Sequence, residues 1–378
     1  MPRPCSRRTF LRVAAAAPLA IAGRSLAHAA AGTSLARGAT VAIARARSYG
    51  PEAAAALRQS VRLLGGLGPL VRGKTVAVKV NLTGWPFQPV AGRAPGETFV
   101  THGDTAGALA ALLADAGARR IRFLDSVATA LPFEEAVAAA GWDVRAVRAA
   151  GPVEFENTRN LGSGRRYAQL KVPGGGRVFS SFEVNHSYEE ADVFVSLCKM
   201  KEHVTAGVTL SLKNLFGLPP NSLYGAETGE EKLGHRAPMH DAARNGLRLL
   251  PGERPGFQDL AAGARVPRSI VDLGAAWPVH LAIVEGIRTI RGGEGPWHAG
   301  VSPIDPGLIV AGWNAVSTDA VAMAAMGFDA HAPSFMPRPD KRENHVRMAE
   351  EAGLGTADLE RIEVRGLGIA EARTPFRT

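Results

Sequence analysis

Lysine is rare in this sequence and occurs where chemistry is possible. The 378 residues contain 36 arginines but only eight lysines. Four of the eight follow apolar segments that are typical of buried strands: Lys79, Lys199, Lys201 and Lys213. A lysine offers a compact charge and a pKa that burial can shift, whereas arginine offers a rigid fork. We therefore expect these four lysines to bind an anion or to take part in a reaction.

The segment 198–217, CKMKEHVTAGVTLSLKNLFG, is rich in polar and reactive side chains. His203 stands beside two lysines and is the candidate general acid or base, since an imidazole exchanges protons near neutral pH. Lys201 is its candidate catalytic partner. Further groups suited to bind phosphate or carboxylate follow in the same segment: Thr209, Lys213, Asn214 and Gly217.

Two other segments are expected to reach the same ligand. Lys79 and Asn81 lie two residues apart on a predicted strand, so their side chains point to one side. Gly295 lies in the loop Gly292–Pro296, where glycine allows the backbone to approach a ligand closely. In open α/β sheets ligands bind beyond the carboxyl ends of the strands, which is where these segments fall.

A divalent metal is a second possibility for this site. His203, His235 and His240 are the candidate ligands, with nearby carboxylates as partners, and such donor sets suit zinc, iron or manganese. Their spacing does not match a zinc signature such as HExxH. The cofactor therefore stays unknown at this point.

Several common sites are excluded by their missing motifs. No GxGxxG opens the first predicted helix and no GxxxxGK[ST] occurs, which argues against standard dinucleotide and ATP sites. No GxSxG follows a strand. Besides Cys5, Cys198 is the sole cysteine, so we expect no intrinsic iron–sulfur cluster, and its position at the end of an apolar strand favours a core role over a nucleophilic one.

The elements that must position these residues alternate between strands and helices. We predict strands at 40–46, 74–82, 120–125, 143–147, 192–197, 280–285 and 307–311, and an edge strand at 362–365. Helices are predicted at 51–67, 103–116, 132–140, 267–276 and 315–326. This alternation indicates an α/β fold with a mostly parallel or mixed central sheet and helices on both faces.

The middle of the chain is less regular. Short β-like pieces at 168–172 and 177–182 predict a small antiparallel excursion, and residues 218–256 form a long Gly- and Pro-rich loop. We find no internal repeat and no clear linker after residue 38. The sequence therefore predicts one α/β domain over residues 39–378.

The first residues predict export. Ser6–Arg12 (SRRTFLR) has the pattern of a twin-arginine signal, an apolar run follows, and Ala27–Ala29 is typical of a signal-peptidase site. We therefore expect a signal peptide at 1–29, a linker at 30–38 and a periplasmic or other extracytoplasmic product. The twin-arginine translocase and signal peptidase are the expected partners. The apolar run is too short to span a bilayer, and no later stretch approaches a span.

Charge does not indicate nucleic-acid binding. The formal net charge is +9, and without residues 1–29, which hold five arginines and no acid, it is +4. No Lys/Arg run with interleaved aromatics occurs. We expect a small anionic molecule, rather than a nucleic acid, as the ligand.

The same segments resemble the domain of unknown function 362 family over about residues 74–330. The resemblance rests on Lys79–Leu82 (KVNL), Lys199–His203 (KMKEH), Thr209, Lys213–Asn214 and Gly217, a later histidine at 235 or 240, the turn Gly295–Pro296 and a closing strand–helix unit with Asp319. This sequence departs from the family pattern at Glu202 and at Glu285–Gly286, and it lacks the cysteine motifs of some relatives. The resemblance implies an α/β fold and one shared pocket, with no settled reaction.

Two classes of function remain open from the sequence. The first is an exported enzyme that binds a small anion among lysine, histidine and asparagine side chains. The alternative is a non-catalytic protein that binds or delivers a cofactor or metal, or a partner of an iron–sulfur redox system.

Overall fold

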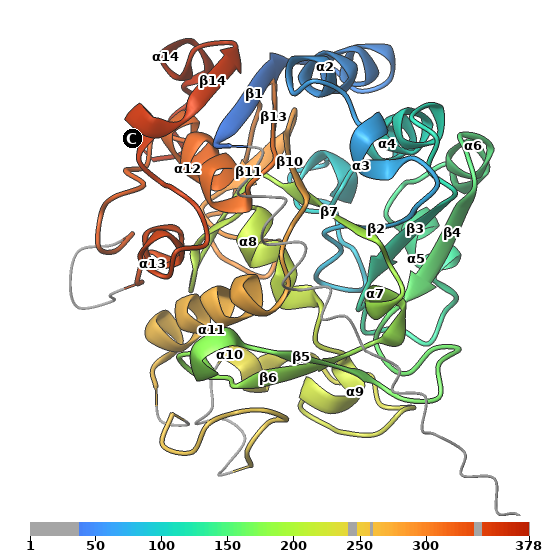
Figure 1. Cartoon of the computed structure of the whole chain (residues 1–378), viewed down its shortest axis with the longest axis vertical. Helices are drawn as coiled ribbons and strands as arrows, with labels where there is room; N and C mark the ends of the chain where they lie inside the picture. The colour runs from blue at the N-terminus through green and yellow to red at the C-terminus, as the bar shows by residue number, and fades with distance from the viewer. Residues whose placement is uncertain (1–37, 241–247, 258–259, 336–341, 378) are drawn as a thin grey trace, which may run out of the picture.

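An eight-stranded sheet runs through the centre of the protein in the computed structural model, which describes residues 38–240, 248–257, 260–335 and 342–377 (Figure 1). Its strands lie in the order β14-β1-β13-β10-β7-β2-β3-β4. The bounds along the chain are β1 Thr40–Arg45, β2 Thr75–Lys79, β3 Arg120–Asp125, β4 Val153–Asn157, β7 Val193–Lys199, β10 Leu281–Gly286, β13 Leu308–Gly312 and β14 Glu363–Gly366.

The sheet is mixed. Strands β10, β7, β2, β3 and β4 pair in parallel, whereas β13 is antiparallel to both of its neighbours, β10 and β1. The edge strand β14 is parallel to β1. The carboxyl ends of five adjacent strands therefore meet at one edge of the sheet, where α/β proteins place their ligands.

Helices cover both faces of the sheet. Alternate strand residues point to opposite faces, so each strand contributes apolar side chains to both layers. Val41 and Ile43 of β1 join one buried apolar cluster, and Ala42 and Ala44 join the other. The second cluster packs under α2 Pro51–Leu63, α4 Gly103–Asp115, α5 Phe133–Ala139 and α6 Val144–Ala149. The first packs under α8 Ser211–Asn214, α11 Ala262–Ala276, α12 Ala315–Ala325, α13 His345–Glu351 and α14 Ile369–Ala372.

Three two-stranded antiparallel sheets project from this frame: β5 Ala168–Lys171 with β6 Ser181–Val184, β8 Lys201–His203 with β9 Gly207–Thr209, and β11 Thr289–Arg291 with β12 Ser302–Ile304. The second follows directly on β7 and the third on β10. Short helices complete the description: α3 Gly68–Val71, α7 His186–Glu189, α9 Asn221–Tyr224 and α10 Ala237–His240.

The predicted fold class is confirmed: a mixed sheet, helices on both faces and a small antiparallel excursion. The predicted signal peptide 1–29 and residues 30–37 of the predicted linker lie outside the described residues. Within the described ranges, no helix has the length and apolar character that a membrane crossing would need.

The predicted strand at 143–147 is wrong. Residues 144–149 form helix α6, and the strand comes later, at β4. Asp143 caps this helix, because its carboxylate accepts the N–H of Ala146. The alternation Val-Arg-Ala-Val suggested a strand, but the aspartate cap and the alanines favour the helix.

Helix α11 begins five residues earlier than predicted, so Pro267 lies inside it. Proline has no N–H to donate to the carbonyl four residues earlier. That carbonyl, of Gly263, instead accepts the N–H of Glu343. The helix tolerates Pro267 because the backbone of another segment donates the hydrogen bond that the proline cannot.

Candidate functional site

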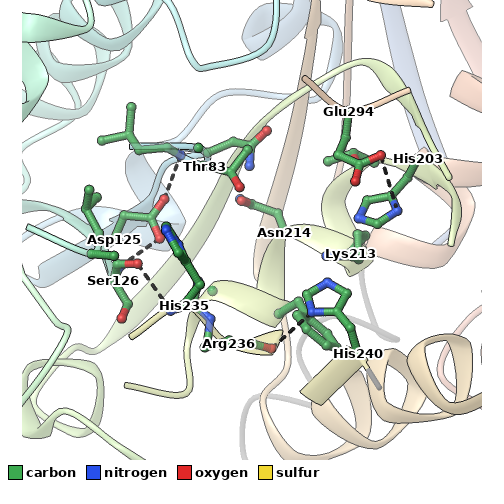
Figure 2. Close-up of a pocket in the computed structure, with 18 of the residues that line it drawn as sticks. Thr83, Asp125, Ser126, His203, Lys213, Asn214, His235, Arg236, His240 and Glu294 are labelled. Atoms are coloured by element: carbon green, nitrogen blue, oxygen red, sulfur yellow. Dashed lines mark hydrogen bonds and ion pairs between the residues drawn. The ribbon is translucent and has the colours of Figure 1, made fainter. Parts of the chain in front are cut away.

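A cavity of about 370 Å³ opens beyond the carboxyl ends of β2 and β3, next to the β8–β9 hairpin (Figure 2). The structure brings most of the predicted site residues to its walls. They are Lys79, Asn81, Lys201, His203, Thr209, Lys213, Asn214, Gly217, His235 and His240. Two predicted residues, Lys199 and Gly295, are not among its lining residues.

Lys79 reaches the cavity as part of a buried ion pair. Its Nζ lies 2.7 Å from Oδ1 of Asp125, and both side chains are almost fully buried. Asn214 holds the same lysine twice, since its Oδ1 accepts from Nζ and its Nδ2 donates to the Lys79 carbonyl. Burial lowers the pKa of Lys79, although Asp125 opposes this shift. Because Asp125 already balances its charge, Lys79 is a weaker receptor for an anion than the sequence predicts.

Gly217 is packed against this ion pair. A Cβ atom at position 217 would lie 2.6 Å from Nζ of Lys79 and 2.8 Å from Oδ1 of Asp125. Both atoms are fixed by their partners, so neither can move away cheaply. Glycine is therefore required here by the close approach of the chain to the ion pair, at the wall of the cavity.

Lys201 and Lys213 are held in the cavity wall differently from Lys79. Nζ of Lys201 donates to the carbonyls of Phe99 and Glu294, and Nζ of Lys213 lies 4.2 Å from the centre of the Phe216 ring. Within the described part of the chain, neither pairs with a carboxylate. Burial is the main cause that lowers the pKa of each to about 7.

The rings of His203 and His240 lie nearly parallel, with centroids 6.2 Å apart. Nδ1 of His203 accepts the backbone N–H groups of Thr205 and Ala206. Burial holds the pKa of His203 well below its usual range. We therefore assign a neutral ring with its proton on Nε2.

His240 has the opposite tautomer. Its Nδ1 lies 3.0 Å from the carbonyl oxygen of Arg236, which can only accept, so Nδ1 carries the proton. Burial and then the charge of Lys213 lower the pKa of His240 to about 4. The ring is neutral at pH 7, and its Nε2 has a free lone pair to accept a proton.

Glu294 lies in the loop that joins β11 to β12 and was missed as a site residue. Its carboxylate accepts the N–H of Val204, contacts Nε2 of His298 at 2.7 Å and lies 3.7 Å from Nδ1 of His203. Burial acts to raise the pKa of Glu294, but the pKa is lowered overall, in part because the Val204 N–H and the His298 ring hydrogen-bond to the carboxylate. In the sequence it resembled a solvated loop charge.

Arg236 was also missed. Its Nη1 donates to the carbonyls of Ser126 and Pro219 and to Oδ1 of Asn221, so the guanidinium ties its own loop to two other segments of the cavity wall. Nothing in the sequence distinguishes it from the other arginines. Ser126 could have been found, because it follows Asp125 at the end of a predicted strand.

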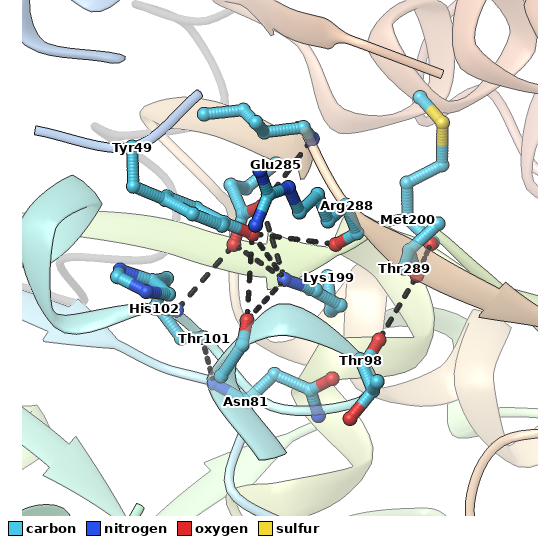
Figure 3. A network of polar contacts seen from close by, with 12 residues as sticks. Tyr49, Asn81, Thr98, Thr101, His102, Lys199, Met200, Glu285, Arg288 and Thr289 are labelled. Carbon is cyan, nitrogen blue, oxygen red and sulfur yellow. Dashed lines mark hydrogen bonds and ion pairs between the residues drawn. The ribbon is translucent and has the colours of Figure 1, made fainter. Parts of the chain in front are cut away.

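Lys199 serves a separate buried network, shown in Figure 3. Its Nζ pairs with Glu285 at 2.9 Å, and neither side chain has any exposure. It also donates to the Tyr49 hydroxyl and to the Gly96 carbonyl. Tyr49 stacks on His102, with ring centroids 3.5 Å apart. The prediction that Lys199 binds the ligand is thus corrected: its charge is used inside the fold.

Gly295 contributes through Trp297, which does line the cavity. A Cβ at position 295 would lie 2.2 Å from the indole ring. The prediction of direct ligand binding through Gly295 is therefore replaced by a packing role. Cys198 is buried in the core, as expected, and burial raises the pKa of its thiol well above the usual range.

The predicted metal ligands His203, His235 and His240 do not form one group. Figure 2 shows His235 well apart from the other two rings, on the side of the cavity where Asp125 and Ser126 lie. Across the residues that the structure describes, no set of three or more His, Cys, Asp and Glu side chains is arranged to hold a metal ion. The β8–β9 hairpin carries His203, whereas α10 carries His240, and His235 precedes that helix in the loop.

Comparison with known proteins gives a family and distant relatives. The sequence pattern of the family described as Domain of unknown function (DUF362) matches residues 76–324, more than half of the chain. A thylakoid-associated protein of Synechocystis is 26% identical over 305 residues, which cover 79% of this chain and 77% of that protein.

Two solved structures match at low similarity. One is a Thermotoga maritima protein, with 15% identity and a TM-score of 0.40, covering 74% of this chain and 61% of the other. The other is the lactate racemase apoprotein from Thermoanaerobacterium thermosaccharolyticum, with 13% identity and a TM-score of 0.40, covering 73% and 54%. The chain thus spans between half and two thirds of the length of these two proteins.

Proposed function

The chain belongs to the family described as Domain of unknown function (DUF362), and we propose that its cavity is an acid–base active site for a small anionic substrate. The observation that carries the proposal is the pair of opposite tautomers at His203 and His240. One ring offers a lone pair that can take a proton from the substrate, and the other offers an N–H that can hydrogen-bond to the negative charge that then develops.

The two histidines are fixed by the backbone rather than by each other. Nδ1 of each ring is engaged by the main chain, which leaves Nε2 of each as the nitrogen available to a substrate. Burial keeps both rings neutral at pH 7. His240 can therefore begin a catalytic cycle as a base, and His203 as a neutral hydrogen-bond donor.

Lys201 and Lys213 would hold the anionic group of the substrate. Both line the cavity, and neither pairs with a carboxylate among the described residues. An anion bound beside them favours their charged forms and raises their pKa from about 7. Asn81 and Thr209 line the same cavity and would orient the substrate.

The lysines predict a pH dependence for anion binding. Because protonated lysine is needed, affinity should be highest below pH 7 and fall as pH rises through about 7. If one lysine must be charged, the loss between pH 6.5 and 8.5 is at least about tenfold. Isothermal titration calorimetry with inorganic phosphate and with acetate measures this directly.

A matched pair of variants controls this experiment. Lys213→Ala should weaken binding at pH 6.5 and flatten the pH profile. Lys232→Ala should leave both unchanged, because Lys232 is exposed and pairs with Glu227 outside the cavity. An affinity that does not vary between pH 6.5 and 8.5 would rule out the lysines as the anion receptors.

We also propose export by the twin-arginine route, on the support of Ser6–Arg12 and the apolar run that follows. Replacing Arg7 and Arg8 by lysine should keep the chain in the cytoplasm at its full length. Cell fractionation with an antibody to the carboxyl terminus reads this out. A full-length cytoplasmic product from the unchanged sequence would contradict the proposal.

A further inference from the structure

Trp297 is a large apolar side chain that is half-exposed to solvent at the wall of a polar cavity. It is 47% exposed, although it lines the cavity that also holds Lys201 and Lys213. Indole rings bury large apolar areas and are favoured where a flat face meets a ligand. Trp85 lines the cavity as well, so aromatic and cationic groups face one space.

The position of this indole is built into the fold. A Cβ at Gly84 would lie 2.1 Å from the ring and a Cβ at Gly295 would lie 2.2 Å from it. Gly84 also has a φ of +79°, which favours glycine. Phe99 meets the indole edge-on, with ring centroids 5.8 Å apart. Two glycines and one aromatic edge thus hold an exposed ring in one orientation.

Phe99 connects this ring to the anion-binding lysine. Its carbonyl accepts from Nζ of Lys201, and its ring centre lies 5.7 Å from the same nitrogen. The same Phe99 ring contacts the indole of Trp297. Lys201 and the half-exposed indole thus share Phe99 as a neighbour and line the same cavity.

We propose that the substrate carries a planar apolar body behind its anionic head, and that Trp297 selects for that body by stacking on it. This rests on the proposed function, because it needs the lysines to hold the head. An arylalkyl carboxylate and an aryl phosphate both have this chemistry. A short anion such as acetate fills only the lysine end and leaves the indole exposed.

The test compares two pairs of anions by calorimetry at pH 6.5: phenylacetate with acetate, and phenyl phosphate with inorganic phosphate. The test uses the full-length protein unchanged, and then the variants Trp297→Ala and Trp297→Phe. Leu131→Ala is the control, since Leu131 is similarly exposed, at 42%, and does not line the cavity. Circular dichroism checks that each variant is folded.

We expect the unchanged protein to bind at least one aryl anion about tenfold more tightly than its parent anion. Trp297→Ala should abolish this preference and leave the affinity for the parent anion within twofold, whereas Trp297→Phe and Leu131→Ala should retain it. Equal affinities within both pairs, or a preference that survives in Trp297→Ala, would overturn the inference alone. If no anion of either pair binds, the proposed function fails and the inference fails with it. The pair that shows the preference identifies the head as carboxylate or phosphate.

Discussion

Replacing Glu285 by glutamine should destabilise the protein by about 3–5 kcal/mol, because it leaves Lys199 without its carboxylate in the interior. The two side chains are fully buried, and both Glu285 oxygens lie within 3.0 Å of Nζ. Burial already lowers the pKa of Lys199 against the opposing effect of Glu285. Without that carboxylate the lysine must either stay charged at a high cost or lose its proton.

The loss should also reach the candidate site. Lys199 donates to the carbonyl of Gly96, and Glu285 accepts the N–H of His102, so the pair fastens both ends of the segment that contains Phe99 (Figure 3). Phe99 in turn accepts from Lys201. We therefore expect Glu285→Gln to weaken anion binding as well as folding.

Urea denaturation gives the free energy of unfolding for this comparison. Asp305→Asn is the control, because Asp305 pairs with Arg93 at the surface and such pairs contribute about 1 kcal/mol or less. The double variant Lys199→Met with Glu285→Gln should recover part of the loss, since it removes the unpaired charge. A cost below about 1 kcal/mol for Glu285→Gln, or a double variant less stable than the single one, would refute this account of the network.

Replacing either His203 or His240 by glutamine should lower turnover by about 10²- to 10⁴-fold, the usual range for a positioned base or for a fixed hydrogen-bond donor to developing charge. The affinity for the anion should change by no more than about threefold, because the lysines hold it. Glutamine cannot take the proton that His240 would accept, and its flexible amide does not fix a donor where Nε2 of His203 lies. Each ring is engaged by backbone at Nδ1, so the effect should come from Nε2.

His331→Gln is the control for both histidine variants. His331 is exposed and lies near Glu350, outside the lining of the cavity. Its replacement should leave turnover unchanged. Equal turnover in the His203 and His240 variants and in the unchanged protein would remove both rings from the chemistry, whatever their effect on stability.

Most of the sheet could be predicted because its strands are buried on both faces and read as short apolar runs between helices. The segment 143–147 failed because four residues of alternation fit a strand and a helix equally well. The cap at Asp143, which accepts from Ala146, and the alanines favour the helix.

The site was harder to predict, for a geometric reason. Lys199 and Lys201 would share one face of a continuous strand. However, β7 ends at Lys199 and β8 begins at Lys201, so Met200 breaks the alternation and the two lysines enter different environments. Lys199 meets Glu285, while Lys201 reaches the cavity.

Glu294 and Arg236 were missed because their places depend on long-range packing. Glu294 is carried by the loop after β11, and Arg236 by the loop before α10, both far in sequence from His203. The local sequence around either residue does not indicate that its side chain would reach the site. The lysine bias of the sequence indicated Lys201 and Lys213, which line the cavity, because that bias reflects the chemistry of the side chain rather than its position.

The most direct test of the central claim is proton NMR in heavy water on each anion that binds, with catalytic amounts of protein. This spectrum reports both exchange of a substrate C–H with solvent and any other chemical change in the ligand. We predict that at least one bound anion changes in the presence of the unchanged protein and stays intact with His203→Gln or His240→Gln. Binding of these anions without change in any of them would contradict an acid–base enzyme and identify the cavity as a site of capture alone.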